Sequence, residues 1–331
     1  MLRDPAAAPS GSWLSRILAR AGDLRRRSGG GHAPLLGLAV LYLLAVSAIM
    51  IWRRIVITPD YLFLIMVPLA LLAGRLTRFL REWVPFAALL LGWEAMRGLA
   101  PTLGASVHTG GLDAEKILFL GQVPTVILQK WVAAIHLRAF MDPATTIIYF
   151  GHFAVTLGVA MLLWLGDRPR FLQYSTALLG MSFAAFLIFV MVPTAPPWWA
   201  ADHGLFQGMH RIFAVTLPSR LSPYYRSLNP NPVAAIPSLH AAFPFLTYLV
   251  LRRRYRLAAG VALAWCLLVW WSVVYLGEHY VVDVLAGAAL ALIAWIVVQR
   301  LVVPRVSGMQ VRPRLRILQE RRAEAMAGRA Q

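Results

Sequence analysis

Two histidines and one aspartate in the C-terminal third of the chain have types and spacing that suit phosphoryl transfer. His240 lies in the stretch PSLHAAF, which opens an apolar run. His279 and Asp283 lie in SVVYLGEHYVVDVLAG, four residues apart and therefore on one face of a helix. A carboxylate in that position can accept the N–H of one imidazole nitrogen, which fixes the tautomer and lets the other nitrogen attack an electrophile.

These residue types predict a reaction through a phosphohistidine. His279 would attack phosphorus, Asp283 would orient its ring and stabilise its positive form, and His240 would protonate the leaving oxygen and then activate the acceptor. Such chemistry needs neither a metal nor a cofactor, and no spacing typical of a metal site occurs, so none is predicted.

Phosphoryl oxygens also need hydrogen-bond donors and cations. Ser238 would stand at a helix N-terminus, where free N–H groups and the helix dipole favour an anion, although capping alone also explains a serine there. His152 lies inside an apolar segment, where an ionisable group is a functional candidate. Three loop arginines are candidate phosphate ligands, with headgroup contacts or plain surface charges as alternatives: Arg211, Arg220 and Arg226.

The composition is that of a polytopic membrane protein. Hydrophobic residues make up 59% of the 331 residues and charged residues 14%, against about 25% charged in soluble domains. The fold class expected is an all-α membrane helical bundle with about eight transmembrane helices. Apolar segments long enough for spans, or nearly so, lie at 34–52, 61–80, 84–99, 145–166, 173–192, 236–251, 257–276 and 281–303.

The basic residues predict the orientation. Most of the 32 Lys and Arg residues flank the spans on the side of the two termini, so the positive-inside bias puts both termini in the cytoplasm of a multi-pass cell-membrane protein. The long loops and both histidine motifs then face the extracytoplasmic side. The net charge of +18 is better matched by anionic headgroups than by nucleic acid, which is not an expected partner.

The two motifs resemble the second and third signatures of the type 2 phosphatidic acid phosphatase and haloperoxidase superfamily. The loop PTAPPWW, the form PSLH and the pair GEHYVVD are most similar to the branch that contains inositol phosphorylceramide synthase and sphingomyelin synthase. The resemblance implies that His279 is the nucleophile, His240 the acid and base, and Asp283 the orienting group. It also implies that the family's helical core lies in the C-terminal part.

The sequence departs from the superfamily in two places. No lysine stands seven residues before an Arg-Pro pair, and Arg168-Pro169 lies on the predicted cytoplasmic side. The serine of the third signature is kept as Ser272, a candidate phosphate ligand, but Val273 replaces the expected arginine. Both losses remove phosphate-binding cations and fit the synthase branch better than the phosphatase branch.

The predicted organisation has four parts. Residues 1–33 would be a basic cytoplasmic segment, 34–111 the N-terminal transmembrane helices, 112–303 the catalytic membrane domain and 304–331 a basic cytoplasmic tail. The oligomeric state is left open.

Three functions remain open at this point. The first is a phosphotransferase that moves a phosphoryl or phospho-headgroup from a phospholipid or lipid phosphate to an alcohol such as inositol or a lipid hydroxyl. The second is a lipid phosphatase that uses water, on polyprenyl or diacylglycerol phosphates. The third is a non-catalytic lipid-binding or transport protein, which the complete His240, His279 and Asp283 set argues against.

Overall fold

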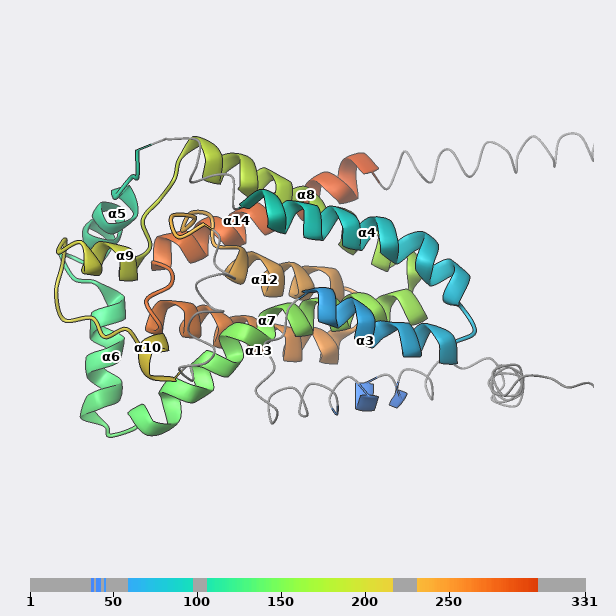
Figure 1. Ribbon diagram of the computed structural model, residues 1–331, viewed down its shortest axis with the longest axis horizontal. Helices are drawn as coiled ribbons and strands as arrows, with labels where there is room; N and C mark the ends of the chain where they lie inside the picture. Colours follow the sequence, from blue (N-terminus) through green and yellow to red (C-terminus); the bar gives the residue numbers. More distant parts are fainter. Residues whose placement is uncertain are drawn as a thin grey trace, which may run out of the picture. The chain divides into compact units, whose positions relative to one another are not determined.

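The computed structural model of the chain describes residues 59–97, 106–216 and 231–302, with a few isolated positions between 37 and 45. Arg220, Arg226, the basic N-terminal segment, the tail from 304 and most of the predicted first span lie outside the described residues. The elements are α3 (Pro59–Leu72), α4 (Leu76–Arg97), α5 (Gly110–Leu118), α6 (Pro124–Ala134), α7 (Arg138–Gly166), α8 (Arg168–Met191), α9 (Pro197–Asp202), α10 (Phe213–Thr216), α12 (Leu239–Leu251), α13 (Arg256–Tyr275), α14 (Val281–Val297) and a π-helical turn (Val298–Val302) (Figure 1).

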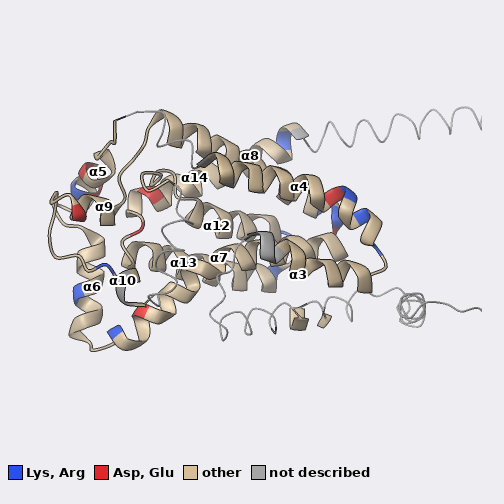
Figure 2. Ribbon diagram, in the orientation of Figure 1, with Lys and Arg blue, Asp and Glu red and all other residues tan. Residues whose placement is uncertain are grey.

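The all-helical class is confirmed for the described part of the chain, where only two isolated β-bridges accompany the helices. Four helices there are long and apolar enough to cross a membrane: α7, α8, α13, and α14 with its π-helical turn. The middle of α8, α13 and α14 carries no Lys, Arg, Asp or Glu (Figure 2). The total of eight spans stays a prediction.

One predicted span is wrong in its bounds. The segment 61–80 is divided, because α3 ends at Leu72 and α4 begins at Leu76. Gly74 has a φ of +62°, and the Arg75 N–H donates to the Ala70 carbonyl at 2.9 Å. A glycine in the left-handed region with such a bond ends a helix. Hydropathy alone missed this stop signal.

The described residues form two compact units. The first contains residues 59–92 and 153–168, and the second contains 93–97, 106–152, 169–216 and 231–302. In the first unit, the Glu82 carboxylate accepts from the Trp164 indole at 2.8 Å and pairs with Arg168 at 2.6 Å. Every described candidate site residue lies in the second unit.

Helix α12 packs against both α13 and α14 in the second unit (Figure 1). The Trp270 indole of α13 donates to the Ala241 carbonyl at 3.1 Å. On the other side, the Ser238 N–H donates to the Asp283 carbonyl at 3.0 Å. A Cβ at Gly287 would lie 2.1 Å from the Ser238 carbonyl oxygen, so only glycine lets α14 approach the start of α12 this closely.

We predict that Gly287→Ala destabilises the protein by roughly 1–3 kcal/mol or more, because the clash is with backbone and cannot be relieved by a rotamer change. Thermal unfolding in detergent micelles measures this. The matched control is Gly260→Ala in α13, where a Cβ would meet nothing within 4 Å; it should gain up to about 1 kcal/mol from helix propensity. Equal behaviour of the two variants would contradict the close approach.

Candidate active site

The two histidine motifs meet in the second unit. Ser238 is the N-cap of α12, and its hydroxyl accepts from the Ala241 N–H at 3.2 Å. His240 therefore lies in the first turn of α12. His279 lies in the short connection between α13 and α14, and Asp283 lies in the first turn of α14. The interlocked starts of α12 and α14 thus hold all three predicted catalytic residues.

The imidazoles of His240 and His279 are in direct contact. His279 Nδ1 lies 3.0 Å from the Ala235 carbonyl oxygen. Because a carbonyl oxygen only accepts, Nδ1 carries the hydrogen and Nε2 of the neutral ring carries the lone pair. His279 Nε2 lies 3.0 Å from His240 Nδ1, which must then be the donor. The network therefore places a nitrogen with a lone pair next to a nitrogen that donates a hydrogen.

Asp283 is completely buried beside this pair. Its Oδ2 accepts from the Tyr280 N–H at 2.8 Å and lies 3.6 Å from His279 Nδ1. Within the described part of the chain, its Oδ1 has no hydrogen-bond partner. The backbone carbonyl of Ala235 thus takes the imidazole N–H, while the carboxylate stands next to the ring at ion-pair distance.

Helix α7 adds a tyrosine and a third histidine. The Tyr149 ring stacks on His240 with 4.4 Å between centroids, and the His152 ring lies 4.4 Å from the same imidazole. His152 Nδ1 lies 2.5 Å from the Tyr149 carbonyl oxygen and donates to it. The structure therefore places His152 against His240. The rings of Tyr149 and His152 limit how the His240 side chain can rotate.

The stretch PTAPPWW holds the Ala235 carbonyl in place. Thr194 forms isolated parallel bridges with His108 and Ala234. The Ala235 N–H donates to the Thr194 carbonyl at 3.3 Å, and the Ile236 N–H donates to the Thr194 hydroxyl at 2.8 Å. Two hydrogen bonds, both made by the backbone of Ala235, therefore link Thr194 to the His279 ring.

The connection that carries His279 is fixed from outside α13 and α14. Gly277 has a φ of +76°, and a Cβ there would lie 2.7 Å from the Met209 sulfur, so the position requires glycine. The buried Gln129 side chain of α6 donates to the Tyr275 carbonyl at 2.9 Å, and Thr125 donates to the Val274 carbonyl at 2.8 Å. Figure 1 shows α5, α6 and α9 at the end of the unit where α14 begins.

The other predicted phosphate ligands lie in different surroundings. The Ser272 hydroxyl donates to the Leu268 carbonyl one turn back in α13, at 2.7 Å. The Arg211 guanidinium pairs with Asp202 at 2.7 Å and lies 4.4 Å from the centre of the Trp198 ring. The backbone N–H of Trp198 donates to the Gly277 carbonyl at 3.0 Å. This bond links the pair of Trp198 and Arg211 to the connection that carries His279.

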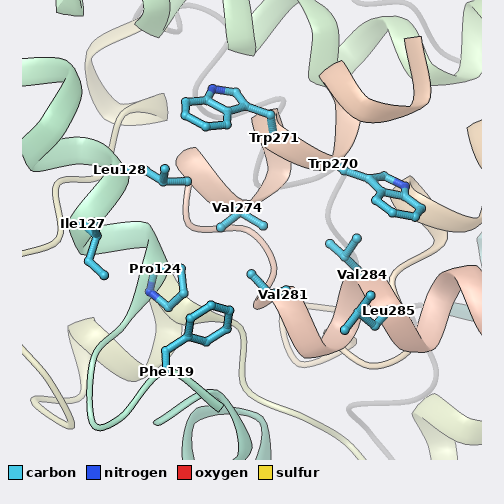
Figure 3. A pocket seen from close by; sticks show the side chains of 10 residues that line it. All are labelled: Phe119, Pro124, Ile127, Leu128, Trp270, Trp271, Val274, Val281, Val284 and Leu285. Carbon is cyan, nitrogen blue, oxygen red and sulfur yellow. The ribbon is translucent and has the colours of Figure 1, made fainter. Parts of the chain in front are cut away.

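An apolar groove lies between α6, α13 and α14, on the flank of α14 that carries Val281, Val284 and Leu285 (Figure 3). Its volume is about 410 Å³, and its lining is apolar and aromatic side chains. It offers hydrocarbon contacts and no group that could bind or attack a phosphate. None of His240, His279 and Asp283 lines this groove.

Sequence reasoning missed four residues that shape this site. The Ala235 carbonyl carries no side-chain signal at all. The roles of Thr194 and Gly287 follow from close backbone contacts between segments far apart in the chain. Glu115, which contacts the start of α14, belongs to neither histidine motif. Among the described residues, no three His, Cys, Asp or Glu side chains come together as a metal site.

A histidine pair with a buried carboxylate, set among apolar helices, fits a membrane enzyme of the phosphotransferase class. The model of the PAP2 superfamily matches residues 112–297, more than half of the chain, and the chain belongs to this superfamily. The resemblance read from PSLHAAF and GEHYVVD is thereby confirmed.

The relatives found are named synthases. The chain is 29% identical over 283 residues to the phosphoinositol dihydroceramide synthase of Bacteroides thetaiotaomicron, covering 78% of this chain and 90% of that protein. It is 29% identical to the inositol phosphorylceramide synthase catalytic subunit aur1 of Schizosaccharomyces pombe and 28% identical to the Candida albicans inositol phosphorylceramide synthase, over 46% and 43% of this chain. It spans only 39% and 32% of those two yeast proteins. No solved structure matches the chain significantly.

We predict that Thr194→Val lowers stability by about 1–3 kcal/mol, because the Ile236 N–H loses its acceptor in a partly buried place. Thr194→Ser keeps the hydroxyl and should stay close to the parent. Thermal unfolding of the two variants in micelles checks this, and a Val variant as stable as the Ser variant would remove Thr194 from the support of Ala235.

Proposed function

We propose that the protein transfers a phosphoinositol headgroup from a phospholipid to the hydroxyl of a ceramide-type lipid, through a phosphohistidine at His279. The names of the relatives support the headgroup and the acceptor class. The observation that carries the chemistry is the 3.0 Å contact between His279 Nε2 and His240 Nδ1, with Nδ1 of His279 committed to the Ala235 carbonyl. This arrangement gives one nitrogen a lone pair and the other a proton.

In the first half-reaction, the His279 Nε2 lone pair attacks phosphorus and forms a P–N bond. The P–O bond to the diacylglycerol breaks, and protonated His240 gives its proton to the leaving oxygen. In the second half-reaction, neutral His240 takes the proton of the acceptor hydroxyl, whose oxygen attacks phosphorus. The P–N bond breaks, and His279 is regenerated.

The geometry sets a requirement on His240. A phosphorus atom with its leaving oxygen must fit between the nucleophile and the acid, which needs more room than the 3.0 Å between the two nitrogens. His240 therefore turns away from His279 when substrate binds, while Tyr149, stacked on its ring, and His152, tilted against it, limit that turn. We propose that this stacking keeps the acid close to the leaving oxygen.

Asp283 acts at the charged stages of the cycle. A phosphorylated or protonated imidazole carries positive charge, and the Asp283 carboxylate lies 3.6 Å from its Nδ1. At such a distance in a buried setting, the attraction is far stronger than in water. The carboxylate thus lowers the energy of the phosphohistidine and of the transition states that lead to it.

The site is proposed to face the extracytoplasmic side, with both termini in the cytoplasm. The positive-inside pattern of the sequence supports this orientation. The residues that remain proposals as phosphate or substrate contacts are Ser238, Arg211, Arg220, Arg226, His152 and Ser272. For Arg211, the guanidinium would have to bind a phosphate and Asp202 at the same time.

We predict that His279→Ala abolishes turnover, and that His240→Ala and Asp283→Asn each lower kcat by at least about a hundredfold. Purified protein in mixed micelles would receive phosphatidylinositol with a ceramide, with water alone or with free inositol. The new sphingolipid phosphodiester, inositol phosphate and inorganic phosphate are followed together. Radiolabelled donor should also leave an acid-labile adduct on His279.

The matched control is His203→Ala, a loop histidine that stacks on Trp199 at 3.6 Å and lies outside the histidine cluster; it should keep parental turnover. In a parallel assay with phosphatidic acid as donor, release of inorganic phosphate to water, without any headgroup transfer from phosphatidylinositol, would replace the transferase by a lipid phosphatase. Full activity of His279→Ala with either acceptor would refute the phosphohistidine route.

A further inference from the structure

Glu115 is a completely buried carboxylate that the proposed reaction does not use. It lies on α5, outside the four long apolar helices. An acidic side chain at such a depth is costly unless hydrogen bonds or charges compensate it. Burial raises the pKa of Glu115 above the ordinary carboxyl range, and hydrogen bonds from the backbone of α14 offset part of that rise.

Those hydrogen bonds connect Glu115 to the backbone that follows His279, the proposed nucleophile. Its Oε1 accepts from the Val281 N–H at 3.1 Å, and its Oε2 accepts from the Val282 N–H at 3.3 Å. The preceding N–H, that of Tyr280, goes to Asp283. Three successive N–H groups at the start of α14 are therefore held by two carboxylates, immediately after His279. A helix N-terminus is where anions are most stable.

A second residue of α5 faces the same place. A Cβ at Gly111 would lie 3.1 Å from the Tyr280 ring and 3.6 Å from Asp283 Oδ1. Gly111 and Glu115 are four residues apart and share one face of α5. This face thus packs on the turn from Tyr280 to Asp283. Gly111 lies beside the side chain of Asp283, and the Glu115 carboxylate accepts from the backbone N–H groups of Val281 and Val282.

We infer that Glu115 is a positioning residue for the His279–Asp283 pair, through its bonds to Val281 and Val282. The inference rests on the proposed function. Without this carboxylate, two N–H groups at the start of α14 would have no acceptor, and Asp283 would be the remaining anion at that helix end. Asp283 would then move towards the N–H groups and away from the imidazole, so that the charged stages of the cycle lose their counter-ion.

The test compares Glu115→Gln with Asp113→Asn. Both remove one negative charge from α5, but Asp113 is exposed. Gln keeps the shape and offers one acceptor to two N–H groups. We expect Glu115→Gln to lower kcat about ten- to a hundredfold, as displacements near 1 Å at reacting groups do, with little change in KM, when measured at a temperature where the variant is still fully folded. Asp113→Asn should behave like the parent.

A readout that needs no turnover is the rate at which diethyl pyrocarbonate modifies His279, followed by peptide mass spectrometry. The rate should change in Glu115→Gln and not in Asp113→Asn. If Glu115→Gln fails to fold, Glu115→Asp, which keeps the charge and withdraws it by one methylene, is measured in the same way.

Parental kcat in Glu115→Gln, or a loss of kcat that only follows a lower melting temperature, would overturn the positioning role and leave a structural cap. If the parent protein transfers no headgroup to any acceptor, the proposed function fails. In that case the modification rate decides: a changed rate in Glu115→Gln still supports positioning of His279, and an unchanged rate overturns it.

Discussion

The hydrogen bond from His279 Nδ1 to the Ala235 carbonyl is the interaction on which the chemistry of the site depends. It fixes the tautomer of a neutral imidazole with a neutral acceptor, and so leaves the lone pair on Nε2, towards His240. Several segments far from Ala235 and His279 in the sequence hold the two partners of that hydrogen bond in place. Thr194 holds the strand-like stretch of Ala235, while Gly277, Gln129 and Thr125 hold the connection that carries His279.

The close approach of α12 and α14 follows from the need of backbone groups for hydrogen-bond partners. Backbone groups among apolar helices must find partners within the protein, since lipid offers none. The Ser238 N–H meets the Asp283 carbonyl, and Gly287 removes the side chain that would keep these helix starts apart. Backbone hydrogen bonds and a glycine thus set the distance between the two motifs, which the proposed joint action of His240 and His279 on one phosphate requires.

Much of this could be predicted from the sequence, because side-chain chemistry leaves a pattern. The type and spacing of His240, His279 and Asp283 indicated a shared site, and long apolar runs indicated α7, α8, α13 and α14, although α7 and α8 begin earlier than predicted, at Arg138 and Arg168. The break at Gly74 was missed because hydropathy averages over a single left-handed residue. The Ala235 carbonyl and the burial of Glu115 could not be predicted, since each depends on contacts between segments far apart in the chain and on backbone atoms that every residue possesses.

The division between a carbonyl and a carboxylate around His279 has a chemical sense. If Asp283 held the Nδ1 hydrogen directly, its charge would stabilise the positive imidazole at every stage and reduce the share of neutral nucleophile. With the Ala235 carbonyl at 3.0 Å and Asp283 Oδ2 at 3.6 Å, the neutral ring is oriented by a dipole. In the proposed reaction, the attraction of the carboxylate is strongest when the ring becomes charged, as phosphorus bonds to Nε2. An electrostatic interaction that strengthens along the reaction accelerates it, whereas one equally strong throughout does not.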